Sequence, residues 1–227
     1  MPAEADLPVR FAINLGNAVL ATTTEQGEPG GITVELAKKI AARLHRMPQW
    51  VTYPAAGKVV EDAASDRWDI AFLAIDPKRA EQLYFTTPYI TIQGTLLVKE
   101  GNSLRSVAGM DQPGVVINVG KNAAYDLWLS RNLQHATLNR LPSSQEAIDH
   151  FLQGEGDMAA GIRQPLEKAA REIAGYRVLA DNFTEIQQAI CVAKQHIASF
   201  PFLSAWLAEW RQDGSLQHII AEHIALR

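Results

Sequence analysis

Short apolar runs alternate with amphipathic segments along the first ninety residues of the chain. A compact apolar run at 9–14 is typical of a buried strand that ends in a turn. Residues 32–44 place apolar side chains four positions apart, which predicts a helix with one apolar face. Further apolar runs predict strands at 50–53 and 70–73, with a helix at 59–64 between them. This alternation of strands and helices favours parallel strands in an α/β layer.

The same alternation restarts after a polar, glycine-containing stretch at 100–114, which predicts a boundary between two lobes. Before this stretch, two separate strands are expected at 83–87 and 91–99, on either side of Pro88. After it, the expected strands lie at 115–119, 138–141, 158–162, 176–179 and 186–193, and the expected helices at 123–133, 144–152, 165–174, 200–212 and 215–225. The predicted fold class is therefore α/β with two lobes.

Composition and charge narrow the classes of function. The chain has 227 residues, 47% hydrophobic and 20% charged, which is enough for one large domain or two smaller lobes. A formal net charge of −4 weighs against nucleic acid as a partner. The single cysteine, Cys191, excludes an internal disulfide, and the scattered histidines predict no metal site.

The sequence leaves two cellular compartments as alternatives. No apolar run approaches the roughly 18 residues that a membrane helix needs. The first eight residues lack the basic and apolar regions of a signal peptide. The expectation is therefore a cytoplasmic protein if Met1 is the native start, and a periplasmic one if a signal has been removed.

Five segments, in order, resemble the family 3 extracellular solute-binding proteins, which are the polar-amino-acid receptors of ABC importers. These segments are 31–44 (GITVELAKKIAARL), 68–71 (WDIA), 76–81 (DPKRAE), 84–89 (YFTTPY) and 212–216 (QDGSL). The second half matches more loosely, through 114–117 and 154–157. The resemblance covers nearly the whole chain and implies a two-lobed periplasmic binding protein type II fold with a hinge of two crossing strands.

The resemblance also implies how the chain is divided and what it works with. Lobe one would comprise residues 1–96 and 193–227, and lobe two residues 97–192, with hinge strands at 91–99 and 186–193. A small ligand would be captured between the lobes by hinge closure, without a cofactor. The implied partners are that ligand and an ABC permease, and the implied state is a monomer.

The first candidate ligand-binding residues follow the third predicted strand. The family uses the arginine at the position of Arg79 to bind a ligand carboxylate, and a guanidinium suits this role because it is planar and stays charged when desolvated. The alternative is a solvated helix arginine, paired with Glu81 or Asp76. Asp76 is also a candidate that could orient Arg79. Its alternative is an N-cap beside Pro77 at the start of a short helix.

Three further candidates follow the first two strands. Asn14 and Asn17 lie where the family often has an acid and a ring-stacking aromatic, and both amides could bind a polar ligand or simply form the turn. Lys58 lies in a loop that faces the ligand in relatives, and its alternative is an exposed lysine. Phe72 and Ala74 replace the serine or threonine that amino-acid binders tend to have, which removes two polar side chains.

In the second lobe the resemblance points to Asn122, Arg163 and Gln164. Asn122 belongs to a predicted helix start, where free amides attract an anion. Amino-acid receptors carry an aspartate for the ligand's ammonium near Ile162, and here Arg163 follows an apolar residue instead. Arg79 and Arg163 together therefore suggest a ligand with more than one anionic group. The alternative for Arg163 is a surface arginine at a helix start.

Three functions remain open on this basis. The first is a solute-binding protein, not an enzyme, that captures a small carboxylate, amino-acid-like or another organic anion, for ABC-type import. The second is a cytoplasmic ligand sensor or a stand-alone binding module with the same kind of site. The third is a dehydratase-like enzyme, which would need a general acid among candidates where only Asp76 is acidic.

Overall fold

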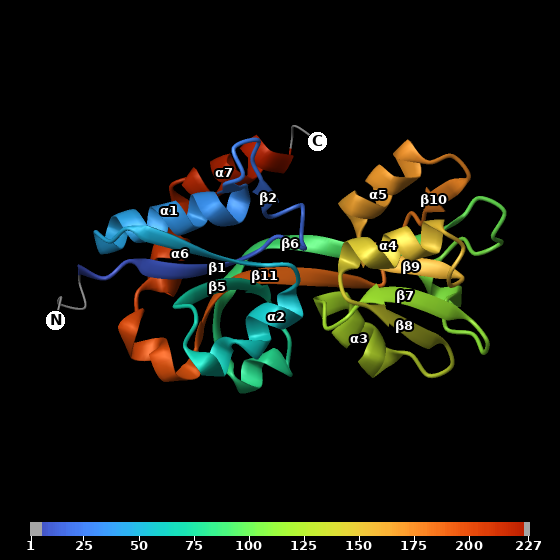
Figure 1. The fold of residues 1–227 in the computed structure, drawn as a ribbon, viewed down its shortest axis with the longest axis horizontal. Helices are drawn as coiled ribbons and strands as arrows, with labels where there is room; N and C mark the ends of the chain where they lie inside the picture. Colours follow the sequence, from blue (N-terminus) through green and yellow to red (C-terminus); the bar gives the residue numbers. More distant parts are fainter. Residues whose placement is uncertain (1–5, 225–227) are drawn as a thin grey trace. The chain divides into compact units, whose positions relative to one another are not determined.

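The computed structural model describes residues 6–224, which form two compact units. Unit 1 comprises the chain up to Ile90 and from Gln188 onward, and unit 2 comprises Thr91–Gln187. Two strands, β6 (Leu83–Lys99) and β11 (Thr184–Ala193), carry the chain from one unit to the other (Figure 1). The boundaries expected from the sequence, at 96/97 and 192/193, lie within the same two strands.

The sheet of unit 1 contains three parallel strands. Strand β1 (Val9–Asn14) lies between β4 (Pro48–Tyr53) and β5 (Ile70–Ala74) and is parallel to both, and β11 pairs antiparallel with β5. Among the described residues, this unit also contains a two-stranded hairpin, α-helices and short 3₁₀ helices: β2 (Thr22–Thr23), β3 (Pro29–Gly30), α1 (Ile32–Leu44), α2 (Ala56–Glu61), η2 (Ala63–Ser65), η3 (Arg79–Glu81), η5 (Lys194–Ser199), α6 (Leu203–Gln212) and α7 (Ser215–Ile224).

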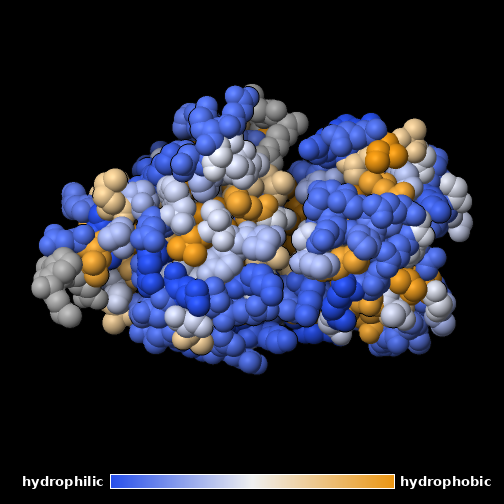
Figure 2. Space-filling model, viewed as in Figure 1, coloured by the Kyte–Doolittle hydropathy of each residue, from blue (hydrophilic) through white to orange (hydrophobic). Residues whose placement is uncertain are grey.

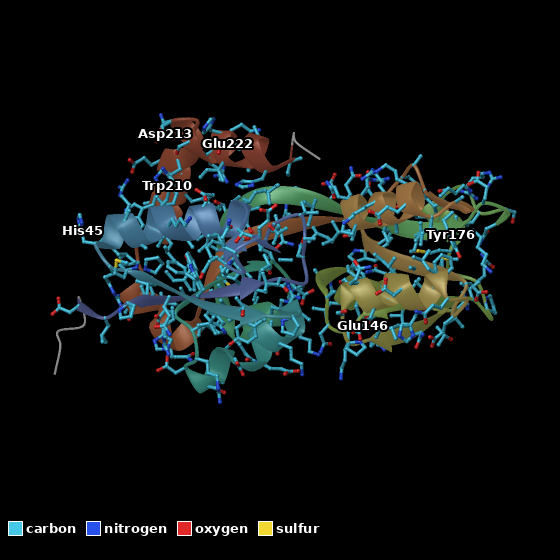
Figure 3. The ribbon with its side chains drawn as sticks, turned by 45° about the horizontal axis from the view of Figure 1, so that its top comes forward. His45, Glu146, Tyr176, Trp210, Asp213 and Glu222 are labelled. Atoms are coloured by element: carbon cyan, nitrogen blue, oxygen red, sulfur yellow. The ribbon has the colours of Figure 1, made fainter. Side chains whose placement is uncertain are left out.

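Helix α1 forms where the apolar spacing predicts it. Its buried face includes Leu36, Ala37 and Ile40, and the helix ends at His45, whose left-handed backbone lets its N–H return to the oxygen of Ala42. Figure 3 shows His45 at the end of α1, and it shows Trp210 on α6. The ammonium of Lys39 lies 5.1 Å from the ring centre of Trp210, so a cation–π contact joins the two helices.

The sheet of unit 2 repeats the parallel arrangement. Strand β7 (Val116–Gly120) lies between β8 (Thr137–Leu141) and β9 (Met158–Ile162) and is parallel to both, while β6 is antiparallel to β9 and to β10 (Tyr176–Val178). The helices of this unit are α3 (Ala124–Asn132), α4 (Ser144–Leu152), α5 (Arg163–Glu172) and the 3₁₀ helix η4 (Val107–Gly109). Glu146 on α4 and Tyr176 on β10 are labelled in Figure 3.

The expected interruption of β6 at Pro88 is wrong, because β6 runs unbroken over 17 residues. Proline cannot donate to a sheet and is tolerated where one side of a strand has no partner. The pairing of β6 with β9 begins only at Gly94, so Pro88 precedes it. The helix expected at 59–64 begins earlier, at Ala56, and ends at Glu61.

The surface is largely hydrophilic on the face shown in Figure 2, with small hydrophobic patches on each unit. Side chains such as Met47 and Phe202 contribute exposed apolar area. Within residues 6–224, no helix combines the length and the apolar character needed to cross a membrane.

Candidate functional site

Parallel strands bring the unit 1 candidates to one edge of the sheet. Strands β1, β4 and β5 end at Asn14, Tyr53 and Ala74, and the loops that follow therefore start at the same edge. Ligands of open α/β sheets bind at this carboxyl edge. The candidates of this unit follow these strands, and they are Asn14, Asn17, Lys58, Asp76 and Arg79.

Arg79 is buried at the end of β5. Its side chain is only 3% exposed, and Nη1 donates to the main-chain oxygen of Ala74 over 3.2 Å. Burial lowers the pKa of Arg79, and the negative charge of Asp76 acts in the opposite direction. The alternative of a solvated helix arginine is therefore wrong. A guanidinium stays charged even when desolvated, so this edge holds a fixed positive charge.

Asp76 shapes the turn that holds Arg79. Its Oδ1 accepts from the main-chain nitrogens of Lys78 and Arg79, over 2.9 and 3.4 Å. The oxygen of its own main chain accepts from the nitrogen of Ala80 over 2.9 Å. The expected helix beginning at Pro77 is absent, because η3 begins at Arg79 with Lys78 as its N-cap; Asp76 instead accepts hydrogen bonds within the turn that precedes η3. Asp76 is buried, so one carboxylate both caps the turn and places negative charge beside the guanidinium.

The two asparagines after β1 have different surroundings. Oδ1 of Asn14 accepts from the main-chain nitrogen of Gly16 over 2.9 Å, which is the turn-forming role. The main-chain oxygen of Asn17 accepts from Leu20 and Ala21, over 3.0 and 3.1 Å. The side-chain oxygen of Asn17, in contrast, is buried and has no hydrogen-bond partner within residues 6–224.

Lys58 lies on α2, and its side chain is exposed. Its Nζ lies 3.3 Å from Oε2 of Glu61, three residues along the same helix. This geometry favours the alternative interpretation, an exposed lysine in a surface ion pair.

Unit 2 has a carboxyl edge of the same kind. Strands β7, β8 and β9 end at Gly120, Leu141 and Ile162, and each is followed by a helix. Asn122 precedes α3 with a φ of 61°, and its main-chain nitrogen donates to Oδ2 of Asp126 over 2.8 Å. Asparagine tolerates this left-handed conformation better than most residues, so the residue type suits the turn.

Arg163 begins α5, and acceptors of its own unit surround its guanidinium. Nε donates to Oε1 of Gln93 over 2.6 Å, and Nη1 donates to the oxygen of Leu179 over 2.9 Å. Nη2 donates to the oxygens of Ala180 and Asp181, over 3.3 and 2.9 Å. Arg163 therefore ties the segment after β10 to the start of α5. This arrangement argues against both a solvated surface arginine and a second anion-binding arginine.

Gln164 follows Arg163 at the start of α5. Its Oε1 is buried and, among the residues that the structure describes, has no hydrogen-bond partner. Among the described residues, each unit therefore has one buried amide oxygen without a hydrogen-bond donor, Oδ1 of Asn17 in unit 1 and Oε1 of Gln164 in unit 2.

The family of this chain follows from comparing its sequence with those of known protein families. Residues 9–225 match the sequence profile of the bacterial extracellular solute-binding proteins, family 3. The chain belongs to this family. The expected α/β architecture is confirmed, since solved structures of periplasmic amino-acid-binding proteins share it. The matched range covers all of unit 2 and most of unit 1.

Individual relatives of this solute-binding protein are distant in sequence. The ABC transporter glutamine-binding protein GlnH of Bacillus subtilis (strain 168) is 24% identical over 203 residues, 87% of this chain and 74% of GlnH. The cysteine-binding protein of Campylobacter jejuni is 20% identical with a TM-score of 0.82, covering 96% of this chain and 89% of the other. A histidine kinase sensor domain similar to periplasmic binding proteins is 16% identical with a TM-score of 0.84, covering 98% of both chains.

Sequence reasoning missed a polar group at the carboxyl edge of unit 2. The hydroxyl of Tyr125 accepts from the main-chain nitrogen of Gly120 over 2.9 Å and lies 2.8 Å from Oγ of Ser144. Burial raises the pKa of Tyr125 to about 12, so the phenol stays protonated. A Cβ at Gly120 would lie 2.7 Å from the main-chain nitrogen of Ser144. The signal available in the sequence was this glycine at the end of a predicted strand.

Residues 6–224 contain no group of three or more His, Cys, Asp or Glu side chains that could hold a metal ion. Cys191 is buried in β11, and burial raises the pKa of its thiol to about 12. Burial and the raised pKa both disfavour the thiolate form of Cys191. On the same strand Gln188 is buried and Gln187 exposed, as alternation requires.

Proposed function

We propose that this solute-binding protein captures a small carboxylate, amino-acid-like or another organic anion, for ABC-type import, and that Arg79 binds the carboxylate. The supporting observation is the burial of Arg79 at the carboxyl edge of unit 1, where Ala74 and the Asp76 turn hold it. A buried guanidinium costs desolvation energy, and proteins retain such groups where an anion binds. The protein makes and breaks no covalent bonds in this proposal.

Carboxylate is the ligand chemistry that best suits this arginine. A planar guanidinium presents paired donors that match the two oxygens of a carboxylate. Because Nη1 already donates to Ala74, the side chain has a fixed orientation before a ligand arrives. Such preorganisation reduces the entropy lost on binding. The named ligands of two similar proteins, glutamine and cysteine, are amino acids and carry this group.

The other candidates divide by the contacts they make. Asn17, Asn122 and Gln164 are retained as proposed ligand contacts, and Asp76 as a positioning residue for Arg79. Asn14, Lys58 and Arg163 make the local contacts described above, so we assign them to the fold. With Arg163 assigned to the fold, Arg79 is the proposed anion-binding arginine, and a ligand with a single carboxylate is sufficient to pair with it. That both units contribute to one ligand remains a prediction.

The dehydratase-like alternative receives no support from the geometry. Asp76, the one acidic candidate, already accepts two main-chain hydrogen bonds and lies beside Arg79. The sensor alternative shares its fold with the importer components, because a histidine kinase sensor domain is among the similar structures. We propose import, with an ABC permease as partner and work outside the cytoplasmic membrane, because the extracellular solute-binding family and its GlnH relative support it.

The proposal is tested by pairing each carboxylate with its carboxamide in a thermal-shift screen. A ligand at one hundred times its Kd should raise Tm by about 5–10 °C for a chain of this size. Carboxylates should shift the wild-type protein and the matching carboxamides should not. Equal shifts from both members of the pairs would overturn the role of the carboxylate, and this comparison requires no variant.

A variant pair then tests the residue. Arg79→Lys keeps the charge but loses the planar fork, and we expect at least about ten-fold weaker binding. Arg105→Lys is the matched control, because Arg105 is exposed and donates to main-chain oxygens near the end of β6. Both variants are first compared with the wild type by circular dichroism. Unchanged affinity in a folded Arg79→Lys protein would refute the proposed role of Arg79.

A further inference from the structure

Asn122 has a left-handed backbone conformation that no helix end explains. Among residues 6–224, the residues other than glycine with a positive φ are His45, Asp66 and Asn122. His45 ends α1 and Asp66 ends η2, and left-handed residues are common at such helix ends. Asn122, with a φ of 61°, instead precedes α3, in the loop that follows β7 at the carboxyl edge of unit 2. Its conformation therefore has to be held by surrounding contacts.

The carboxylate of Asp126 holds the main-chain nitrogen of Asn122. This nitrogen donates to Oδ2 of Asp126 over 2.8 Å. Nε of Arg140, on β8, donates to both carboxylate oxygens over 3.1 Å, and Oγ of Ser130 donates to Oδ1 over 3.2 Å. The side chain of Asp126 is only 1% exposed. A buried carboxylate on α3 thus joins the loop to β8.

An ionised carboxylate is the group that these partners require. The nitrogen of Asn122, Nε of Arg140 and the hydroxyl of Ser130 all act as donors, and an ionised carboxylate only accepts. Arg140 also supplies the positive charge that offsets the cost of burying a negative one. An amide at position 126 would direct its NH₂ group at one of these donors. Asp126→Asn, although nearly identical in shape, should therefore loosen the loop.

The neighbouring nitrogens of the loop are held by contacts that do not involve Asp126. The nitrogen of Lys121 donates to the oxygen of Leu141 over 2.8 Å, and the nitrogen of Ala123 donates to the oxygen of Gly120 over 3.1 Å. Loss of the carboxylate should therefore release the residue between them while the loop stays folded.

We infer that Asp126 is a positioning residue whose carboxylate holds Asn122 in the conformation from which Asn122 contacts the ligand. This inference rests on the proposed function, in which Asn122 is a ligand contact, and adds a residue that acts through Asn122 without touching the ligand. A contact held in place before binding loses less conformational freedom when the ligand arrives, so it contributes more to affinity.

A double-mutant cycle tests whether Asp126 acts through Asn122. It combines Asp126→Asn with Asn122→Gly, which removes the side chain and adopts a positive φ without strain. The probes are the twenty standard amino acids, lactate, succinate and citrate, and calorimetric titration measures each probe that raises Tm of the wild type. Asp126→Asn should weaken binding by about ten-fold in the wild type and by less than about two-fold in Asn122→Gly. Equal weakening in both backgrounds would overturn the inference, because a merely structural loss does not depend on the side chain of Asn122.

Two further variants supply a matched control and a milder change. Oδ2 of Asp157 accepts from the main-chain nitrogen of Val116 over 2.7 Å at the other end of β7, so Asp157→Asn should leave affinity unchanged. Arg140→Lys keeps a positive charge beside Asp126 and should weaken binding by about three-fold, again only where Asn122 is present. If Asp126→Asn does not fold, the cycle with Arg140→Lys decides the inference by the same criterion.

Hydrogen exchange measures the holding contact without a ligand. In folded Asp126→Asn, the amide of Asn122 should exchange at least about ten-fold faster than in the wild type, as followed by NMR. The amide of Lys121, which has its own acceptor, should change by less than about two-fold. Unchanged exchange at Asn122 would overturn the inference whatever the protein binds, because the carboxylate would then not hold this nitrogen.

The outcomes separate this inference from the proposed function. If no probe binds, or if Arg79→Lys binds as tightly as the wild type, the proposed function fails and the inference fails with it. If probes bind through Arg79 but the losses from Asp126→Asn and Asn122→Gly simply add, only the role of Asp126 fails. A loss confined to proteins that retain Asn122, together with faster exchange at its amide, supports both.

Discussion

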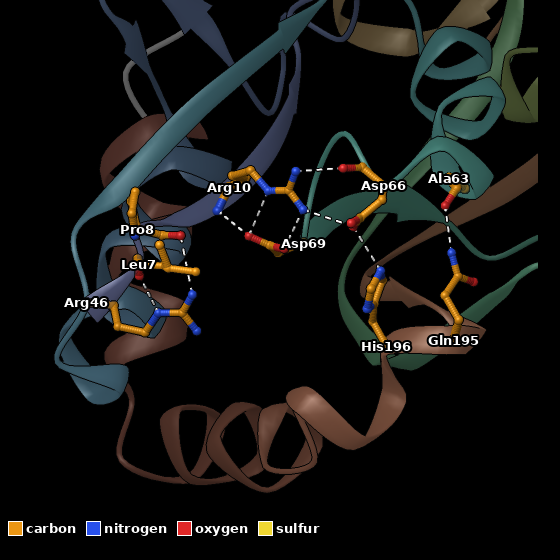
Figure 4. Close-up of polar contacts among 9 residues, drawn as sticks. All are labelled: Leu7, Pro8, Arg10, Arg46, Ala63, Asp66, Asp69, Gln195 and His196. Carbon is orange, nitrogen blue, oxygen red and sulfur yellow. Dashed lines mark hydrogen bonds and ion pairs between the residues drawn. The ribbon is translucent and has the colours of Figure 1, made fainter. Parts of the chain in front are cut away.

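Arg10, near the start of β1, forms an ion pair with Asp69, the residue before β5. Nε and Nη2 of Arg10 donate to the two carboxylate oxygens over 3.2 and 2.9 Å, and the main-chain nitrogen of Arg10 donates to Oδ2 over 2.7 Å (Figure 4). Arg10 also reaches Asp66, whose Oδ1 lies 3.0 Å from Nε2 of His196. This network joins three parts of unit 1 at the sheet edge opposite the candidate site.

The first prediction concerns the stability of unit 1. Asp69→Ala removes three hydrogen bonds to Arg10, two of them from the guanidinium, at a partly buried position. We expect a loss of about 1–3 kcal/mol in the free energy of unfolding, measured by urea denaturation. Lys58→Ala, which breaks only the exposed pair with Glu61, should change it by less than about 0.5 kcal/mol. Equal losses in both variants would contradict a special role for the Arg10–Asp69 pair.

The second prediction concerns pH and Asp111 in unit 2. The main-chain nitrogens of Ala136, Gln134 and His135 donate to its carboxylate over 2.8–2.9 Å and hold its pKa below its ordinary value. A depressed folded-state pKa adds stability above the ordinary value near 4 and loses it as pH falls through the lower folded value. The wild type should therefore be more stable than Asp111→Asn at pH 6, and the difference should shrink below pH 4.

Urea denaturation of both proteins at pH 6, 4 and 3 measures this difference directly. Asp149→Asn is the control, because Asp149 accepts from the side chain of Gln145 on the exposed face of α4. A gap between wild type and Asp111→Asn that stayed constant over this range would rule out the carboxylate as its source.

The third prediction separates two roles for Arg163. Its guanidinium bonds to Gln93 and to the oxygens of Leu179, Ala180 and Asp181. Arg163→Lys cannot keep all of these bonds, so it should destabilise unit 2 by about 1–3 kcal/mol and speed hydrogen exchange around residues 179–183. Arg171→Lys, at an exposed position of the same helix, should change neither. A stable Arg163→Lys protein that bound dianions selectively less well would restore the two-arginine interpretation.

The sequence predicted some of these features better than others, for physical reasons. Periodicity located β1 and α4 at their observed bounds because one strand and one amphipathic helix each bury a face that their own residues define. The expected break at Pro88 was wrong because the sequence shows only that a proline is present. Whether a strand tolerates a proline depends on which neighbouring strands pair with it at that point, and the pairing of β6 with β9 begins only at Gly94. The outcome for Arg163 depended on carbonyl oxygens 16–18 residues away in sequence, which no local pattern reveals.

The same distinction applies within the candidate site. Asn14 and Asn17 are identical residues three positions apart, and the sequence offers the same two roles to both. Only the structure shows that the amide of Asn14 is used by its own turn, whereas the buried oxygen of Asn17 has no hydrogen-bond partner within residues 6–224. The motif predicts a role for Arg79, but only the structure shows that its side chain is buried and donates to the main-chain oxygen of Ala74.

The last prediction concerns Gly16, which sets the distance between the Asn17 loop and the end of β4. A Cβ added at Gly16 would lie 2.4 Å from the oxygen of Pro54, and main-chain atoms cannot move aside as a flexible side chain could. Gly16→Ala should therefore push the loop away, lower stability by about 1–3 kcal/mol and displace the amide of Asn17. Gly101→Ala is the matched control, because nothing lies within 4 Å of a Cβ there. If the loop positions Asn17 for the ligand, Gly16→Ala should also weaken carboxylate binding, whereas a variant with lower stability but unchanged affinity would show that ligand binding does not depend on this loop.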